Sequence, residues 1–398
     1  TNYAHGVTGN GLAPAVLAVT PGPANYDFGT QPTGSSSSQT FTLTNSGGST
    51  ATGIVGGGLL APFTYSGGAY PGGGTCAGGT LAAGANCTFI VDYDPVAANG
   101  AETDTITIDY NDGAAAQQAT LGLDAISQTP ALLTISDSDP YDFGTIAVGA
   151  QSLRSFTITN TGEFQATAMS ETTVGAPFIY TGGGATYPGA TGDCGAILNG
   201  GASCTIEVAY SPGAPAAPDN GTVTFGYNDG VAVQSVARTM TGVAQTPSSI
   251  TMDGGDPYNY GTVATGASVA QVFTLTNGGG FTATSITEIT LAGDFQFTGG
   301  TNTFPGTLGT CVGGGSLPNA GTCDIEVMFI PGGTGALSGT ITIQYNNGVG
   351  TVTETKVLDG TGANPALITI SGADPVDLGN VTVNANTTQL LTLNNTGN

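Results

Sequence analysis

The chain has 398 residues, of which 67 are glycine and none is tryptophan, and only 8% of the residues are charged. The charges are almost all acidic, with 27 Asp and Glu against three Lys and Arg, so the formal net charge is −24. This balance argues against nucleic acid or anionic membrane as a partner, because phosphate binding needs clustered Lys and Arg. Hydrophobic residues still make up 39%, with 15 Phe and 14 Tyr among Thr, Val and Ile, which indicates a folded β protein rather than a disordered acidic chain.

The chain repeats itself at a nearly constant period. Turns that contain Asp or Asn are followed by an anchor residue and a glycine, and the anchors, 115, 117 and 118 residues apart, are Phe28, Phe143, Tyr260 and Leu378. An asparagine lies 17 positions after each anchor and ends a strand, namely Asn45, Asn160, Asn277 and Asn395. A fixed offset inside a drifting period indicates a rigid structural unit with variable loops elsewhere.

In chain order, each repeat predicts the same elements. A strand such as Phe41–Thr44 is followed by a Gly-rich loop and by a strand that opens with a cysteine, such as Cys87–Tyr93. A hairpin with Asn-Asp-Gly or Asn-Asn-Gly comes next, since these residues tolerate the positive φ of tight turns. Apolar residues alternate with Thr, Ser and Glu, as in strands with one buried face, and no window shows helical periodicity. Seven or eight short strands per repeat predict an all-β fold of tandem immunoglobulin-like antiparallel β-sandwich domains.

Prolines mark the starts of successive units, at Pro130, Pro247 and Pro365. The segment Ala4–Gly9 resembles Met240–Ala244, the final strand of a repeat. The predicted domains are residues 1–13 as the last strand of a preceding or partner Ig-like domain, 14–129 as repeat 1, 130–246 as repeat 2, 247–364 as repeat 3, and 365–398 as the first strands of a further Ig-like domain. We therefore expect either a longer natural chain or end strands that complete a domain between subunits.

The six cysteines form local pairs: Cys76 with Cys87, Cys194 with Cys204, and Cys311 with Cys323. A metal site would normally add His or further Cys at short spacing, and His5 is the only histidine. Three disulfides are therefore favoured over metal sites, and they predict an extracellular protein, secreted or at the cell surface. No apolar run is long enough to span a bilayer, so no membrane insertion is expected.

The succession Asp-Phe-Gly, Phe-Thr-Leu-Thr-Asn, Cys-Thr-Ile-x-Val-x-Tyr-x-Pro and Tyr-Asn-Asp-Gly resembles bacterial Ig-like domains of the abnormal-spindle and hydin type. Such domains occur in choice-of-anchor D surface proteins. The resemblance covers nearly the whole chain, and the combined motif is specific although each piece alone is weak. The family is not catalytic, so the resemblance implies no catalytic residues.

Three features are candidates for chemistry, and each has a plainer explanation. His5 has no recurring partner, so Ser–His catalysis is not predicted. Glycine runs such as Gly56–Gly58 lack the Lys-Ser/Thr ending of a phosphate loop. Acidic clusters at residues 137–142, 253–256 and 374–377 leave weak calcium binding open, but Asp-Pro and Asp-Gly are also ordinary turns. The sequence thus predicts no catalytic residue, no cofactor and no defined metal site.

Two functions compete. Repetition without a distinct embellished domain favours a non-enzymatic structural protein, a homo-oligomeric subunit of a surface filament, sheath or stalk. The alternative is an adhesin that binds glycans or host and partner surfaces through the Gly/Tyr-rich segments 63–74, 178–189 and 295–306, which carry Tyr70, Tyr187 and Phe304. Those rings are either platforms for sugars or hydrophobic anchors for their own loops, and anchoring is favoured.

Overall fold

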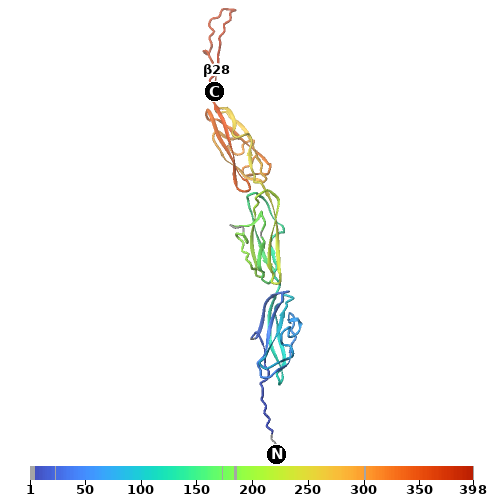
Figure 1. Ribbon diagram of the computed structural model, residues 1–398. Coiled ribbons are helices and arrows are strands. Elements are labelled where there is room, and N and C mark those ends of the chain that lie inside the picture. The colour runs from blue at the N-terminus through green and yellow to red at the C-terminus, as the bar shows by residue number, and fades with distance from the viewer. Residues whose placement is uncertain (1–4, 23, 173, 183–185, 300–301, 398) are drawn as a thin grey trace, which may run out of the picture.

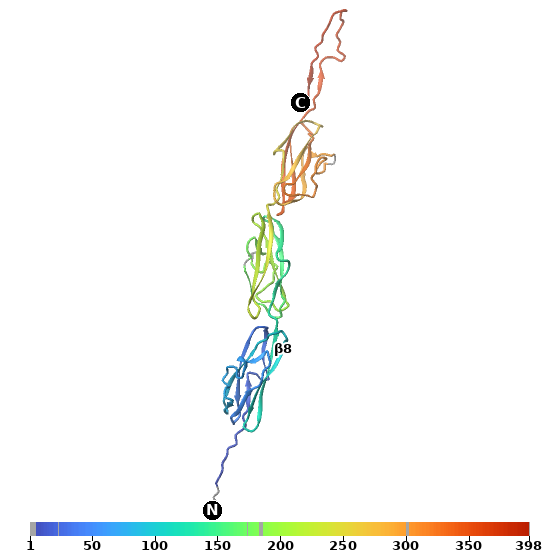
Figure 2. The same ribbon diagram turned by 90° about the vertical axis from the view of Figure 1, so that its right-hand side faces the viewer.

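The computed structural model describes residues 5–22, 24–172, 174–182, 186–299 and 302–397. Three β-sandwiches lie end to end along one line (Figure 1), and the view turned by 90° shows the same arrangement (Figure 2). The N-terminal segment extends from the free end of the first sandwich, and a long hairpin of residues 365–397 lies beyond the third. The described part of the chain contains no α-helix; its one helical element is a 3-10 turn, η1 (Ser66–Gly68).

Repeat 1 contains nine strands, one more than the upper number expected. They are β1 (Leu17–Thr20), β2 (Asn25–Pro32), β3 (Ser37–Asn45), β4 (Ala51–Gly56), β5 (Phe63–Tyr65), β6 (Thr80–Leu81), β7 (Asn86–Tyr93), β8 (Gly100–Asn111) and β9 (Ala116–Gln128). Two sheets result, with the strand orders β1-β3-β7-β5 and β2-β9-β8-β4-β6.

Repeats 2 and 3 have the same plan. Repeat 2 consists of β10 (Leu133–Ile135), β11 (Tyr141–Ala147), β12 (Ser152–Asn160), β13 (Thr167–Thr172), β14 (Phe178–Tyr180), β15 (Ser203–Tyr210), β16 (Ala216–Asn228) and β17 (Val233–Gln245). Repeat 3 consists of β18 (Ile250–Met252), β19 (Tyr258–Ala264), β20 (Val269–Asn277), β21 (Ala283–Leu291), β22 (Phe295–Phe297), β23 (Gly315–Leu317), β24 (Thr322–Phe329), β25 (Gly335–Asn346) and β26 (Thr351–Ala363). Their sheets have the orders β10-β12-β15-β14, β11-β17-β16-β13, β18-β20-β24-β22 and β19-β26-β25-β21-β23. The predicted tandem of Ig-like β-sandwiches is confirmed by this architecture.

One strand pair in each repeat is parallel, which adds to the antiparallel arrangement expected from the sequence. β2 runs parallel to β9, β11 to β17, and β19 to β26. The pair arises because the chain enters each repeat in one sheet, as β1, β10 or β18, and then crosses to the other sheet. There it lies beside the last strand of the same repeat. The second and last strands of a repeat are therefore bonded to each other, whereas the first strand pairs with the third in the opposite sheet.

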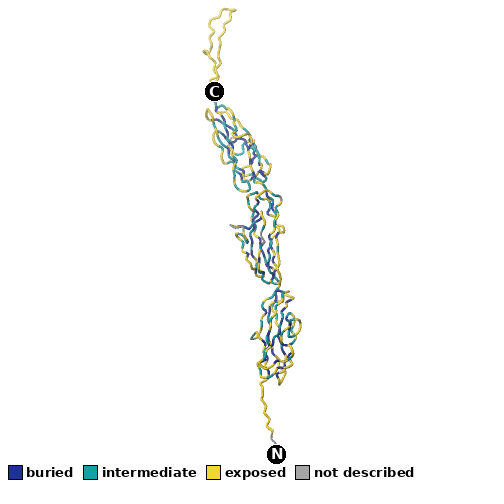
Figure 3. The backbone as a smooth tube through the Cα atoms, in the orientation of Figure 1, coloured by how far each residue is buried: buried dark blue, intermediate teal, exposed yellow. Residues whose placement is uncertain are grey.

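Each sandwich has its own hydrophobic core. Buried residues fill the interior of all three sandwiches, whereas the two terminal segments are exposed along their length (Figure 3). The strand β7 shows the cause, since its side chains are alternately buried and partly or fully exposed from Asn86 to Tyr93. Phe41, Phe156 and Phe273 occupy the same position in the three cores and are fully buried. Apolar side chains at every second position thus produce the three cores.

The anchor turns owe their spacing to backbone geometry. The glycine after the anchor has a positive φ, +72° at Gly29 and +76° at Gly144. Its N–H donates to the aspartate two positions earlier, with distances of 2.7 Å from Gly29 to Asp27 and 2.8 Å from Gly144 to Asp142. Residues with a Cβ rarely adopt this conformation, so the turn requires glycine. The turn directs Phe28 into the core.

A fully buried asparagine ends the third strand of each repeat and uses all of its hydrogen-bonding capacity. In repeat 2, Asn160 Oδ1 accepts from the backbone N–H of Leu132 at 3.0 Å and of Gly162 at 3.1 Å. Its Nδ2 donates to the carbonyl oxygens of Phe164 at 2.8 Å and Leu198 at 3.1 Å. Asn45 and Asn277 make the equivalent four bonds in repeats 1 and 3. The asparagine side chain thereby connects the start of the first strand to two loops whose backbone groups are not paired within the sheets.

Adjacent repeats touch through a glycine. Gly230, in the hairpin turn between β16 and β17, has a φ of +98°. A Cβ at this position would lie 2.6 Å from Phe164 of its own repeat and 2.7 Å from Pro32 of repeat 1. The second junction has the same construction, with Gly348, Phe281 and Ala147 in the equivalent places. The linker is also bonded, since Phe164 N–H donates to Thr129 O at 2.9 Å.

The C-terminal hairpin pairs only with itself among the described residues. β27 (Ile368–Ile370) and β28 (Leu393–Asn395) are antiparallel, with Ile368 opposite Asn395. This is the register of Leu133 opposite Asn160 in repeat 2. Several of its apolar side chains are exposed, Ile370 by 62%.

The buried asparagine predicts a large effect of a small substitution. Asn160→Ala should lower the free energy of unfolding of repeat 2 by about 4 kcal/mol, because two backbone N–H groups and two carbonyls, all buried or partly buried, lose their partner. Urea denaturation of the full chain followed by tyrosine fluorescence would measure it. Asn220→Ala, an exposed position in β16 of the same repeat, is the control and should change the free energy by no more than about 0.5 kcal/mol. Equal effects of the two substitutions would contradict the structural role of Asn160.

Candidate functional site

All six cysteines are in local disulfides. The bonded pairs are Cys76–Cys87, Cys194–Cys204 and Cys311–Cys323, with sulfur–sulfur distances of 2.00, 1.95 and 1.99 Å. In each pair the second cysteine lies at the start of a central strand, opposite the strand that ends in the buried asparagine. The bonds therefore fix the Gly-rich loop to the sandwich and leave no thiol for nucleophilic chemistry.

The aromatic rings of the Gly/Tyr-rich segments point into their own repeats. Tyr70 packs edge-on against Tyr65 with ring centroids 5.3 Å apart, and Phe304 against Phe297 at 5.7 Å. Tyr187 packs in the same way against Tyr180 at 5.8 Å. Burial raises the pKa of Tyr70 and of Tyr187 to about 12. These rings hold the loops to the cores, so they do not form an exposed platform for sugars.

The acidic clusters near the junctions are engaged by donors of the chain itself. Asp139 Oδ1 accepts from Thr239 N–H at 3.0 Å, and Asp256 Oδ1 from Val357 N–H at 2.9 Å. The hydrogen bond from the Thr239 hydroxyl holds the pKa of Asp139 below its usual range. Within the described ranges, no three His, Cys, Asp or Glu residues are placed to hold a metal ion together. The carboxylates act as turn and strand connectors here, and calcium binding stays an untested prediction.

The three Lys and Arg side chains of the chain all lie beside the segment in which the chain crosses from one sheet to the other. We define the crossover as the segment between the first strand and the strand that pairs with the last one, residues 136–140 in repeat 2 and 253–257 in repeat 3. Arg154 donates to Asp137 of the first crossover, from Nε at 3.1 Å and from Nη2 at 2.5 Å. Arg238 donates to Ile135 O beside it, and Lys356 donates to Gly255 O within the second crossover.

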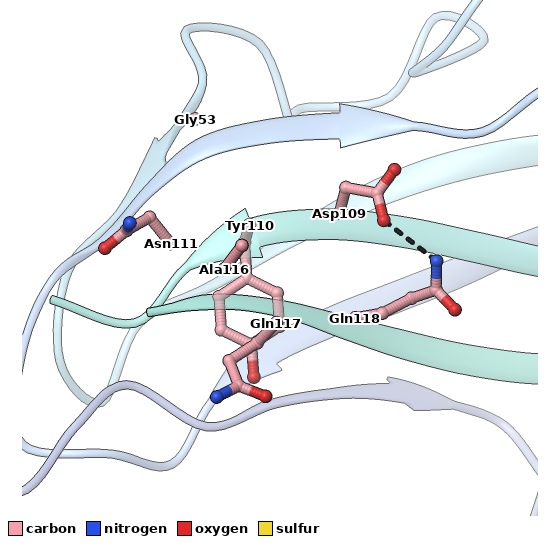
Figure 4. Close-up of a pocket in the computed structure, with 7 residues that line it drawn as sticks. All are labelled: Gly53, Asp109, Tyr110, Asn111, Ala116, Gln117 and Gln118. Atoms are coloured by element: carbon pink, nitrogen blue, oxygen red, sulfur yellow. Dashed lines mark hydrogen bonds between the residues drawn. The ribbon is translucent and has the colours of Figure 1, made fainter. Parts of the chain in front are cut away.

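A surface hollow lies in repeat 1, on the hairpin of β8 and β9 (Figure 4). It is open, measures about 600 Å³ and is lined by Gly53, Asp109, Tyr110, Asn111, Ala116, Gln117 and Gln118. Gln118 Nε2 donates to Asp109 Oδ1 at 2.9 Å, and Gln117 Nε2 donates to Asp112 Oδ2 at 3.1 Å. The hollow offers three amide side chains and one carboxylate, that of Asp109, but no nucleophile with an adjacent base, so its chemistry is hydrogen bonding.

The composition of this hollow is specific to repeat 1. Asp109 lies opposite Gln118 across the hairpin. The equivalent pairs are Gly226 with Ser235 in repeat 2 and Gln344 with Thr353 in repeat 3. The hairpin motif, Tyr-Asn-Asp-Gly, is shared by repeats 1 and 2, so it gave no signal in the sequence for a hollow in repeat 1.

The other candidates have structural positions. His5 is exposed on the extended N-terminal segment, in a position without secondary structure. The glycine run at residues 56–58 ends β4, where Gly57 N–H donates to Thr107 O at 2.6 Å, and the run at 313–315 leads into β23. Neither run precedes a helix as a phosphate loop does. In the described ranges the structure has no helix with the length and apolar character needed to cross a membrane.

The fold defines a class of protein, a linear array of Ig-like β-sandwiches, and comparisons with known proteins add little to it. No protein-family profile matches the chain, and no curated protein matches its sequence. Among solved structures, the chain is similar to the I67–I69 fragment of titin with 10% identity over 88% of this chain and 99% of that one, at a TM-score of 0.29. It is also similar to a PapD-like domain of human CEP192, with 15% identity over 30% of this chain and 87% of that one, at a TM-score of 0.23.

A third similar structure is a protein of unknown function from Porphyromonas gingivalis W83, with 12% identity over 57% of this chain and 99% of that one, at a TM-score of 0.24. At these identities and TM-scores the likenesses carry no argument about activity, ligand or partner. The assignment to an Ig-like array rests on the sheets and cores of the chain itself.

The short disulfide loops predict a stabilisation that can be measured for each repeat. The paired cysteines are 11, 10 and 12 residues apart, and loops of that length should add about 2–3 kcal/mol by restricting the unfolded chain. We therefore expect Cys194→Ser/Cys204→Ser to lower the melting temperature of repeat 2 and to leave repeats 1 and 3 unchanged in calorimetry. Mass mapping of the non-reduced wild-type protein is the control. Bridges between repeats, or free thiols, would refute the local pairing.

Proposed function

We propose that this chain is a non-enzymatic extracellular structural protein, a subunit of a surface filament, sheath or stalk in which each Ig-like repeat is a spacer. The observation that carries the proposal is the linear arrangement of three sandwiches with equivalent junctions (Figures 1 and 2). Each sandwich has a core built from the same positions. In a series of similar units joined by equivalent contacts, the number of units determines the length of the rod, and a stalk or filament requires a defined length.

The proposed location outside the cell is supported by the three disulfides, since such bonds persist in oxidising compartments. The proposed relationship to bacterial Ig-like domains of the abnormal-spindle and hydin type is supported by the motifs, whose residues now have structural roles. Tyr227, for example, accepts a hydrogen bond from Leu133 N–H at 3.3 Å, which joins the Tyr-Asn-Asp-Gly hairpin to the first strand.

We assign residues 14–129, 130–246 and 247–364 to three domains and residues 365–398 to the first strands of a further one. The last assignment is supported by the register of β27 and β28 and by Asn395, whose Oδ1 accepts from Leu367 N–H at 3.2 Å and Gly397 N–H at 3.1 Å as the buried asparagines do. Residues 1–13 would be the last strand of a preceding or partner domain, in which Gly6 and Val7 take the places of Gly242 and Val243.

A second function is favoured by the hollow in repeat 1. Amide and carboxylate groups gathered on one open surface are suited to the hydroxyl groups of a glycan, and repeats 2 and 3 lack the combination of Asp109 with Gln118. In this version the chain is an adhesin with a binding surface on the β8–β9 hairpin of repeat 1 rather than on the Gly/Tyr-rich loops.

The structural proposal predicts self-association that strengthens with salt. Two of the three cations are buried and the third is paired, so contacts between copies must be polar and apolar rather than ionic. Repulsion from the net charge of −24 is screened within about 8 Å at physiological salt and extends further below it. Sedimentation velocity should show larger assemblies at about 150 mM than at about 10 mM salt, and electron microscopy should show filaments or rods. Monomers at high concentration across that range would refute the filament and leave a single-molecule stalk.

The adhesin alternative predicts a loss of binding from one substitution. If the hollow binds glycans, Asp109→Ala should abolish retention on an array of immobilised oligosaccharides. Gln344→Ala, the equivalent position in repeat 3, is the matched control and should bind as wild type does. An array on which the wild-type protein binds nothing, or on which both variants bind equally, would exclude a glycan site in this hollow.

A further inference from the structure

The scarcity of cations makes their position informative. The chain has three Lys and Arg residues in 398, and all three contact a crossover or the residue beside it. If these cations served only to pair with acidic groups on the surface, they could lie anywhere on it. Instead, Arg238 and Lys356 are buried, with 9% and 3% of the residue exposed. Burying a charge is unfavourable unless it is bonded, so these positions must provide bonds that no apolar side chain would make.

The two buried cations are at equivalent positions of the last strand. In the hairpin register, Arg238 lies opposite Val223 and Lys356 opposite Ile341. Leu121 lies opposite Ile106 at the same place in repeat 1 and is 4% exposed. The repeat therefore accepts either a leucine or a cation here, and only the cation reaches the backbone of the first strand or crossover.

The bonds made by these cations connect the two ends of a repeat. Arg238, on β17, donates to the carbonyl of Ile135, the last residue of β10, and its Nη1 is 3.8 Å from Asp139 Oδ2. The next residue, Thr239, binds Asp139 through its backbone N–H and its hydroxyl. Parallel pairing of β11 with β17 begins directly afterwards, at Tyr141 opposite Met240.

Repeat 3 has the same construction. Lys356, on β26, donates to Gly255 O, and Val357 N–H donates to Asp256 Oδ1. Parallel pairing with β19 then begins at Tyr258 opposite Leu358. In both repeats a cation and a neighbouring backbone N–H hold the two sides of the crossover to the last strand.

We propose that these buried cations are mechanical clasps, which slow the extension of repeats 2 and 3 when neighbouring units pull on the two ends of a repeat. In a chain pulled at its two ends, tension enters a repeat through its first strand, passes the crossover into the second strand, and leaves through the last strand, which is parallel to the second. Parallel strands pulled in opposite directions slide past each other, so all bonds between them resist together. The Arg238 and Lys356 bonds join this set, whereas Leu121 contributes none. The inference rests on the proposed structural role, because only a stalk or filament carries tension.

The clasp should affect unfolding under load without stabilising the repeat at equilibrium. Replacing a buried charge by a well-packed apolar side chain is often neutral or stabilising at equilibrium. By contrast, a bond that is made in the native state and broken in the transition state lowers the rate of unfolding. Forced unfolding is governed by that rate. The other repeats indicate which substitutions fit. Leucine fits the position of Arg238 and Lys356, since repeat 1 has Leu121 there, and glutamine fits the position of Arg154, since repeats 1 and 3 have Gln39 and Gln271 there.

The test is single-molecule pulling on the full chain, held at its two ends at constant force. The wild-type chain should show one fast and two slow unfolding events. Arg238→Leu should give two fast and one slow, and Arg238→Leu/Lys356→Leu three fast, with each converted repeat unfolding at least about tenfold faster. Arg154→Gln, which removes the more exposed cation, should change the rate less than Arg238→Leu. Melting temperatures of the leucine variants should equal or exceed that of wild type.

Two results would overturn the clasp. One is unchanged unfolding rates in both leucine variants. The other is a loss of equilibrium stability in step with the faster unfolding, which would make the cations ordinary core contacts. Lys356→Leu tests the same device in a second repeat, so poor folding of one variant does not end the test. Either result leaves filament formation in the electron microscope unaffected, and a wild-type chain that forms no assembly would count against the structural role alone.

Discussion

The fold of each repeat depends on one buried side chain, the asparagine that ends the third strand. Its four hydrogen bonds reach the first strand and two loops, which are the parts that apolar alternation leaves undefined. A fully buried amide is stable only when all of its donors and acceptors are used, so this residue tolerates one arrangement of the surrounding backbone. The disulfide lies on the neighbouring strand, and the hairpin tyrosine binds the first strand from the other sheet. These contacts together specify how the two sheets meet.

Electrostatics has an unusual distribution in this chain. Most acidic side chains are exposed or partly exposed, and several accept hydrogen bonds from backbone N–H groups close by, as Asp27 does from Gly29. The basic side chains are used for internal connections at the crossovers. The surface is therefore nearly free of positive charge, which keeps copies apart at low ionic strength and makes any association depend on neutral groups. A rod of this kind would meet polyanions and membranes of negative charge with repulsion.

Much of the fold could be predicted because its determinants are local in sequence. The anchor turn needs glycine at a positive φ, and the tight hairpin needs Asn or Asp with glycine, so the roles of Gly29 and Gly113 can be read from the sequence. Each cysteine has a partner within about a dozen residues, as Cys87 does. The crossing of the chain from one sheet to the other, between the first and second strands, has no local pattern in the sequence. It is fixed by contacts between residues about 100 positions apart, such as Arg238 with Ile135. Composition likewise predicts no hollow at Asp109, because pairing across a hairpin determines which side chains gather there.

The junction glycines have a consequence for how such an array changes over time. The glycine contact at the first junction comes from two adjacent repeats, with Gly230 and Phe164 supplied by one and Pro32 by the other, and the second junction has Gly348, Phe281 and Ala147 in these places. Copying or deleting a whole repeat would join surfaces that already fit, without any new substitution. The number of units is therefore free to vary between related genes while the interface stays the same. Reach, rather than shape, is the property that duplication in this architecture most readily adjusts.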